Sequence, residues 1–374
     1  MEFLFETQST RSSDFKIGVT NQNKTFLLST KAKPDGQLVK FDKPTRITPI
    51  SVIQDSIKAY AASTQANVLF SNIDHNTNKA KPKDENLKDI NYFVDEFDFS
   101  KTSYKEIWIE IGFGSGRHIL HQAQNNPDVL LIGLEIHTPS IEQVLKQAKL
   151  LNLDNVYAVD YDARLFMEFL ASNSVGRIFV HFPVPWDKKP HRRIYSHPFI
   201  KEALRVLKVD GTLELRTDSE NYYEFCSELL SHYENVDIKK NQDLEVTSKY
   251  EDRWRKQGKN IYDLTLVAKE QSEVKVFDIN FTFEKPINLQ DLEGKLEKKP
   301  IVKKDFFIHF KDLFLSTENQ NEGLLEISMG SFNAPVTKYV SVFNGEIKYF
   351  QGNPIPTSTN LKAHQEIKKI LGSF

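Results

Sequence analysis

The sequence contains very little cysteine, and this scarcity limits what the protein can be. Cys226 is the single cysteine among 374 residues, which excludes internal disulfides and metal clusters built on several thiolates. The chain also lacks any apolar run of about eighteen residues, the length that a membrane helix needs. Its first residues carry acids and no apolar core of signal-peptide length. We therefore expect a cytoplasmic protein without a membrane segment.

A strong excess of one charge sign is absent as well. The 49 Lys and Arg residues nearly balance the 51 Asp and Glu residues, and the formal net charge is −2. A surface that is uniformly positive for nucleic acid is excluded, so any such binding requires a local basic patch. The histidines show no spacing typical of metal ligands, and we predict no metal.

The length and the 39% hydrophobic content predict two or three domains with real cores. Residues 1–95 contain short β-like runs and one amphipathic helical segment at 50–62, which predicts an N-terminal α+β extension. Residues 272–374 offer apolar runs, including 274–283, and a final helix near 360–371. We expect this last region to be a separate, β-rich domain.

The central region, residues 96–271, alternates short apolar runs with amphipathic segments. The expected strands are 107–111, 129–134, 156–159, 177–182, 212–216 and 263–268. A helix is expected from Thr138-Pro139, a capping residue followed by proline at the first helical position. This alternation predicts an α/β domain with a parallel, doubly wound sheet. Ligands of such sheets bind at the carboxyl ends of the strands.

Three glycines at alternate positions follow the first of these strands. They are Gly112, Gly114 and Gly116, and Glu110 stands two residues before them. Glycine lets the backbone turn tightly and lets a ligand approach without meeting a Cβ atom. A dinucleotide fingerprint requires G-x-G-x-x-G, whereas the spacing here is G-x-G-x-G. This pattern favours an S-adenosyl ligand, which has no phosphate, although a purely structural turn is the alternative.

Acidic residues end the next two strands. Glu135 lies 19 residues beyond Gly116, at the place where a carboxylate accepts both ribose hydroxyls of an adenosine. Asp162, followed by an alanine, ends the third strand and is placed to contact the adenine amino group. Asp162 can instead cap the following helix, and the two roles are compatible.

The fourth strand runs into a rigid basic loop, Phe182–Arg193. Three prolines stiffen it, and its cations are Lys188, Lys189, Arg192 and Arg193, with His191 between them. Because the loop follows a strand end, contact with nucleic-acid phosphates is a better interpretation than an ordinary solvated surface. Trp186 can stack on a base or pack beneath the loop.

The order of these motifs resembles the bacterial tRNA (guanine-N7)-methyltransferase family, here with N- and C-terminal extensions. The matching segments are Glu110–Gly116, Gly133–His137, Asp162-Ala163, the FP-x-PW-x-KK stretch at Phe182–Lys189, His191–Arg193, Thr217-Asp218 and Thr247–Glu251. The last segment carries one extra residue between its threonine and tyrosine. The resemblance covers roughly residues 100–270.

The resemblance implies a class I, Rossmann-like methyltransferase domain that transfers a methyl group from S-adenosylmethionine to guanine N7 in tRNA, with the variable-loop guanine as the target. It places Glu110, the three glycines, Glu135 and Asp162 at the cofactor. The residues that it implies for tRNA binding are Lys188, Arg192, Arg193, Asp218, Thr247 and Glu251.

One position departs from the family pattern. The aspartate of the family's FPDPW motif is Val184 here, and valine can neither accept a hydrogen bond nor offset charge. Because neutral guanine has a free lone pair on N7, the reaction requires positioning and charge stabilisation but no general base. Asp187 and Asp218 are the candidate catalytic acids in place of the missing aspartate. Alternatively, backbone contacts of Pro183 and Val184 hold the guanine, and no acid is needed at this position.

Two other functions fit the sequence. A tRNA-binding protein without catalysis is consistent with Val184, and a methyltransferase for a different substrate is consistent with the glycine turn alone. The two extensions fit either a wider contact with tRNA or self-association of the chain.

Overall fold

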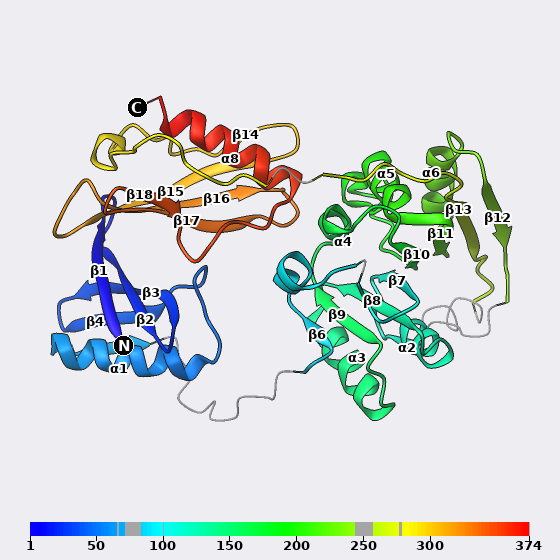
Figure 1. The fold of residues 1–374 in the computed structure, drawn as a ribbon, viewed down its shortest axis with the longest axis horizontal. Helices are drawn as coiled ribbons and strands as arrows, with labels where there is room; N and C mark the ends of the chain where they lie inside the picture. The colour runs from blue at the N-terminus through cyan, green and yellow to red at the C-terminus, as the bar shows by residue number, and fades with distance from the viewer. Residues whose placement is uncertain (66, 72–83, 100, 244–256, 277–278, 374) are drawn as a thin grey trace. The chain divides into compact units, whose positions relative to one another are not determined.

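The computed structural model describes residues 1–65, 67–71, 84–99, 101–243, 257–276 and 279–373. The chain forms two compact units (Figure 1). One, which we call the central unit, is Lys83–Phe277, and the other, the terminal unit, combines Met1–Pro82 with Asp278–Phe374. No helix in the described parts of the chain is long and apolar enough to cross a membrane.

The central unit is built on an eight-stranded sheet with the order β12-β13-β11-β10-β7-β8-β9-β6. Its strands are β6 (Leu87–Lys88), β7 (Glu106–Ile111), β8 (Val129–Glu135), β9 (Val156–Asp160), β10 (Val175–His181), β11 (Leu207–Thr217), β12 (Val236–Lys240) and β13 (Tyr262–Val267). β7 pairs in parallel with β8 and β10, and the parallel pairing continues to β9 and β11. The predicted α/β sheet and its six strands are confirmed.

The direction of β13 differs from the expected all-parallel sheet. β13 pairs antiparallel with both β11 and β12, so the sheet is mixed. The sequence of β13 could not show this, because alternate burial of Tyr262, Leu264 and Leu266 has the same period whichever way the strand runs.

Helices cover both faces of this sheet (Figure 1). α2 (Arg117–Asn125) and α3 (Thr138–Leu150) pack on one face, and α5 (His197–Val206) and α6 (Glu220–Leu230) pack on the other, beside the short α4 (Ala163–Phe166). Alternation along β7 explains the two layers: Trp108 joins the α2–α3 core, while Ile107 and Ile109 join the opposite core. Shorter helical turns of this unit lie at Tyr92–Glu96, Met167–Phe169 and Pro190–Arg192, and the terminal unit has one at Gln290–Leu292.

The terminal unit contains a ten-stranded sheet with the order β18-β17-β16-β15-β1-β2-β3-β4-β5, and β14 pairs with β15. Its strands are β1 (Glu2–Ser9), β2 (Asp14–Asn21), β3 (Lys24–Lys33), β4 (Gly36–Phe41), β5 (Val68–Ser71), β14 (Ile301–Val302), β15 (Phe307–Ser316), β16 (Gly323–Gly330), β17 (Val336–Phe343) and β18 (Glu346–Tyr349). α1 (Ile50–Thr64) packs on β2 and β4, and α8 (Ser358–Leu371) packs on β15 and β16.

The two ends of the chain share this sheet, although the sequence predicted separate N- and C-terminal domains. β1 pairs antiparallel with β15 over three residues of each strand. Thr7–Ser9 lie opposite Ser316–Phe314. A buried Lys16–Asp42 ion pair of 2.6 Å receives a hydrogen bond of 2.8 Å from the Tyr339 hydroxyl. Pairing between strands about 300 residues apart leaves no local pattern, so two separate regions were predicted where the structure has one unit.

The apolar run at residues 274–283 forms no strand in its described residues. Val274 and Val276 are 80% and 87% exposed, whereas Phe281 is 4% exposed and packs in a core of the terminal unit. Apolar composition alone does not produce a strand, because a strand also needs a neighbouring strand to pair with.

Candidate functional site

The predicted glycine turn lies between β7 and α2 and is left-handed at all three glycines. Gly112, Gly114 and Gly116 have φ values of 71°, 51° and 75°. A Cβ atom at Gly116 would lie 2.1 Å from the Val144 side chain, so this glycine allows α2 to pack on α3. A Cβ atom at Gly112 would meet nothing within 4 Å, and at Gly114 only backbone at 3.9 Å. The first two glycines therefore border open space.

Glu135 ends β8 beside this turn. Its carboxylate accepts hydrogen bonds from the Gly114 backbone N–H at 3.1 Å, Ile136 N–H at 2.8 Å and His137 N–H at 3.0 Å. These bonds fix the carboxylate against the glycine turn. Asp160 lies opposite Glu135 in β9, and burial together with the Glu135 charge raises its pKa. The strand ends therefore form a negative edge that suits a cationic ligand with hydroxyl groups.

Glu110 is almost completely buried near the end of β7 and is compensated by a histidine. Its carboxylate lies 2.8 Å from His118 Nδ1, on the first turn of α2. The His118 ring lies 4.4 Å from the ring of His181, the last residue of β10, and burial lowers the pKa of His181 well below its usual value. A cavity of about 210 Å³ opens beside the two histidines, lined also by Gln122 and Asp263.

The histidines and the neighbouring Arg216 are site residues that the sequence did not predict. Arg216 is buried, pairs with Asp263 and donates to the Gln242 carbonyl at 3.0 Å. The eight-residue spacing from Glu110 to His118 was a signal for this contact. A tight turn followed by the first turn of a helix brings the helix start back to the end of the preceding strand. Among the described residues, no three His, Cys, Asp or Glu side chains are placed to hold a metal ion.

Asp162 caps the N-terminus of α4, which confirms one of its two predicted roles. Its carboxylate accepts from the Arg164 backbone N–H at 2.9 Å and pairs with the Arg164 guanidinium at 2.6 Å. These bonds hold the carboxylate at the end of β9, next to Asp160. The contact with adenine stays a prediction.

The loop after β10 is held in an unusual backbone conformation. Phe182 and Trp186 have φ values of 51° and 47°, which are rare for bulky residues. Arg193 secures the loop: its Nε donates to the Pro185 carbonyl at 2.7 Å, and its guanidinium lies 4.4 Å from the centre of the Phe225 ring. Backbone strain of this kind persists only where the surroundings impose it.

The cations of this loop divide into two groups. The side chain of Arg193 is only 9% exposed and pairs with Asp187 at 3.2 Å, so the geometry favours a role in holding the loop. The other cationic side chains and His191 are exposed: Lys188, Lys189, His191 and Arg192. The Arg192 guanidinium lies 5.1 Å from the Trp186 ring, and that ring is 36% exposed, not packed beneath the loop.

The candidate acids near Val184 both have cationic partners. Val184 is 60% exposed at the loop, Asp187 pairs with Arg193, and Asp218, just beyond β11, lies 3.0 Å from Lys259. Thr247 and Glu251, the remaining residues predicted to bind tRNA, lie outside the described residues. The catalytic and binding roles of all these residues stay predictions.

The mixed sheet order, the glycine turn and the acid that ends β8 define a class I S-adenosylmethionine-dependent methyltransferase. A family model described as "Putative methyltransferase" matches residues 104–264. The similarity to curated proteins extends beyond this unit. A tRNA (guanine-N(7)-)-methyltransferase of Wolinella succinogenes is 42% identical over 360 residues, which cover 95% of this chain and 90% of the relative.

Two further relatives carry the same name. The Helicobacter hepaticus protein is 38% identical over 99% of this chain and 94% of its own length, and a Campylobacter jejuni protein is 38% identical over 94% of this chain and 88% of its own length. The chain belongs to the tRNA (guanine-N(7)-)-methyltransferase family. Because the alignments cover nearly the whole chain, these relatives also possess both extensions.

Proposed function

We propose that this protein transfers a methyl group from S-adenosylmethionine to N7 of a guanine in tRNA, at the variable loop, and that it does so in the cytoplasm. The observation that carries the proposal is the Glu135 carboxylate, held by backbone N–H groups beside an open glycine turn. Family membership supports the reaction, and the exposed basic loop supports the RNA substrate.

The residues at the strand ends fit the cofactor. Gly112 and Gly114 leave room for it, and the Glu135 carboxylate, after accepting three backbone hydrogen bonds, retains a lone pair on Oε2 for a ribose hydroxyl. Glu110 is placed to offset the ammonium group, and Asp162 to meet the adenine. When bound, the cofactor supplies an electrophilic methyl carbon on a sulfonium.

The chemistry requires little from protein acids and bases. The N7 lone pair forms the new N–C bond while the C–S electrons return to sulfur, so the positive charge moves from the sulfonium to the purine. The protein must align these atoms and tolerate that charge. Asp187 and Asp218 contribute negative charge, although each is already paired with a cation. Positioning is therefore the main contribution, which is compatible with Val184.

The basic loop supplies the RNA contacts. Lys188 and Arg192 present exposed cations just beyond the end of β10, where the substrate must approach the methyl donor. The exposed Trp186 ring, with the Arg192 guanidinium near it, offers a surface on which a base can stack.

The test is methyl transfer from labelled S-adenosylmethionine to an unmodified tRNA transcript, with nucleosides analysed by mass spectrometry. We expect labelled N7-methylguanosine, and none from a transcript whose variable-loop guanine is replaced by adenine. Val184→Asp should change kcat by less than about fivefold, because a general base is not needed. Cofactor binding without transfer would support the alternative of a non-catalytic tRNA-binding protein.

A further inference from the structure

The two units of the chain differ in charge, which bears on where tRNA is held. The central unit carries 26 Lys and Arg against 32 Asp and Glu, a formal charge of −6. The terminal unit carries 23 against 19, a formal charge of +4. Because a polyanion is repelled by a net negative unit, contacts made by the central unit alone are confined to local patches.

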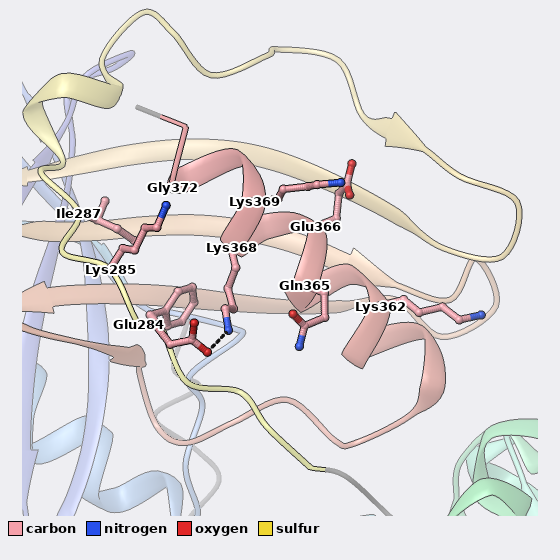
Figure 2. Close-up of a pocket in the computed structure, with 10 residues that line it drawn as sticks. Glu284, Lys285, Ile287, Lys362, Gln365, Glu366, Lys368, Lys369 and Gly372 are labelled. Atoms are coloured by element: carbon pink, nitrogen blue, oxygen red, sulfur yellow. Dashed lines mark hydrogen bonds and ion pairs between the residues drawn. The ribbon is translucent and has the colours of Figure 1, made fainter.

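A groove on the terminal unit concentrates part of this positive charge (Figure 2). Its volume is about 640 Å³, and it runs between α8 and the segment 283–287. The lining side chains are Phe283, Glu284, Lys285, Ile287, Lys362, Gln365, Glu366, Lys368 and Lys369. Four lysines therefore face two glutamates, over an apolar surface from Phe283 and Ile287.

The arrangement of α8 explains why these side chains share one side. Ala363, Ile367 and Leu371 form the buried stripe of the helix, which packs on the sheet. Lys362 and Lys369, seven residues apart, lie on the outer side, and a rise of 1.5 Å per residue separates them by about 10 Å along the axis. The lysine amines of α8 are therefore distributed along the groove.

The ion pairs of the groove leave cationic charge available. Lys285 and Lys369 are exposed, and the ion pairs found at the groove among the described residues involve neither of them. Lys362 pairs with Asp305, and Glu366 pairs with Lys303. Lys368 lies 2.8 Å from Glu284 and lowers the pKa of that carboxyl, but the Glu284 side chain is 69% exposed. An exposed pair of this kind contributes little stability, so a phosphate can replace Glu284 at low cost.

We propose that this groove binds the sugar-phosphate backbone of the tRNA substrate. Lysine amines contact phosphates without reading sequence, and the apolar surface of Phe283 and Ile287 accommodates a ribose or a base edge. The proposal rests on the proposed function, since it assigns the appended unit to the same substrate. Charge complementarity favours RNA over an apolar peptide, and an acidic protein partner is the alternative outcome.

The experiment compares the full-length protein with a Lys285→Ala/Lys369→Ala variant. Equilibrium binding of the tRNA transcript is measured by fluorescence anisotropy between 50 and 200 mM salt, and methylation kinetics are measured beside it. Each lost phosphate contact should reduce the slope of log K against log salt by about 0.7–0.9, and affinity at 0.1 M salt by about five- to tenfold. KM for tRNA should rise in proportion, whereas kcat and the Kd for S-adenosylmethionine should not change.

Lys348→Ala is the matched control, because Lys348 is an exposed lysine of β18 in the same unit and outside the groove. It should leave the salt slope unchanged. Equal slopes and equal KM in the groove variant and wild type would overturn the inference. A loss of binding to an acidic peptide, with tRNA binding intact, would also overturn it. Absence of methylation by the wild-type protein would instead reject the proposed function, so the two failures are distinguishable.

Discussion

Within the described part of the chain, His118 is the side chain found hydrogen-bonded to the buried Glu110 carboxylate. It is 3% exposed, and His118 Nδ1 at 2.8 Å is its hydrogen-bond partner. The other ring nitrogen lies 3.2 Å from the Gln122 amide nitrogen, a donor, so the proton is assigned to Nδ1. His121, Arg177, His181, Glu214 and Asp263 line the same cavity, and Arg216 acts on His181. His118 therefore acts as a positioning residue for a cofactor-binding acid.

Replacing His118 by phenylalanine should make cofactor binding dependent on pH. A buried carboxylate without a donor takes up a proton more readily, and the neutral acid no longer attracts an ammonium group. We expect S-adenosylmethionine affinity to fall by about 5- to 30-fold at pH 7, from the loss of about 1–2 kcal/mol. It should fall further as the pH is lowered from 8 to 6, as measured by isothermal titration calorimetry.

His118→Gln, which keeps a donor, is the control and should restore most of the affinity. Burial lowers the pKa of His181 well below its usual value, which favours the neutral ring. The same dependence of affinity on pH in His118→Phe and in wild type would show that the histidine only fills space.

The loop between β10 and α5 shows how one element combines rigidity with exposed charge. Its two left-handed residues, Phe182 and Trp186, keep their conformation because Arg193 ties the loop to the Pro185 carbonyl and to the aromatic rings of α6. Arg192, one residue earlier, remains exposed beside Trp186. Of these adjacent arginines, Arg193 therefore holds the loop and Arg192 remains exposed to solvent.

Substitutions of the two arginines should have different effects on the free energy of unfolding. Arg193→Ala removes a buried charged hydrogen bond and its packing, and should lower the free energy of unfolding of the central unit by about 2–3 kcal/mol. Arg192→Ala should change it by less than about 0.5 kcal/mol while raising KM for tRNA. Urea denaturation followed by tryptophan fluorescence gives the first quantity. Equal destabilisation by both substitutions would contradict this division.

Local patterns predicted much of the site but not its packing. The glycines and Glu135 could be predicted because a turn and a strand end depend on a few consecutive residues. Arg193 was grouped with the exposed cations, since its charge is visible in the sequence and the rings of α6 that cover it are not. The same limit applies to His118, whose partner Glu110 lies in another element.

On the scale of the whole molecule, the terminal unit is assembled from both ends of the chain. The buried Lys16–Asp42 pair lies on N-terminal segments, and the Tyr339 hydroxyl that donates to Asp42 comes from β17. The Lys16 amine also lies 5.3 Å from the ring centre of Phe314 in β15. This polar cluster connects the two extensions to each other, so neither is expected to be stable alone.

Lys16→Met should destabilise the terminal unit selectively. It leaves Asp42 buried without its cation, which costs about 3–5 kcal/mol. All three tryptophans, Trp108, Trp186 and Trp254, belong to the central unit. Circular dichroism should therefore show an earlier urea transition, while the transition seen by tryptophan fluorescence stays in place.

Two variants sharpen this test. Lys31→Met removes an exposed pair with Asp14, 39% and 40% exposed, and should cost less than about 1 kcal/mol. Lys16→Met combined with Asp42→Leu removes both buried charges and should recover most of the lost stability. A simultaneous shift of the fluorescence transition would show that the two units do not unfold independently.

The sequence by itself determined the α/β class, the glycine turn with its acids, the basic loop and the family, because each depends on short segments whose residue types limit the backbone and the chemistry. Only the tertiary structure decided the direction of β13, the pairing of His118 with Glu110, the inward position of Arg193 and the union of the two extensions. These features arise from contacts between distant segments. Such contacts are selected by the burial and charge compensation of the folded chain, and they leave no pattern in any one stretch.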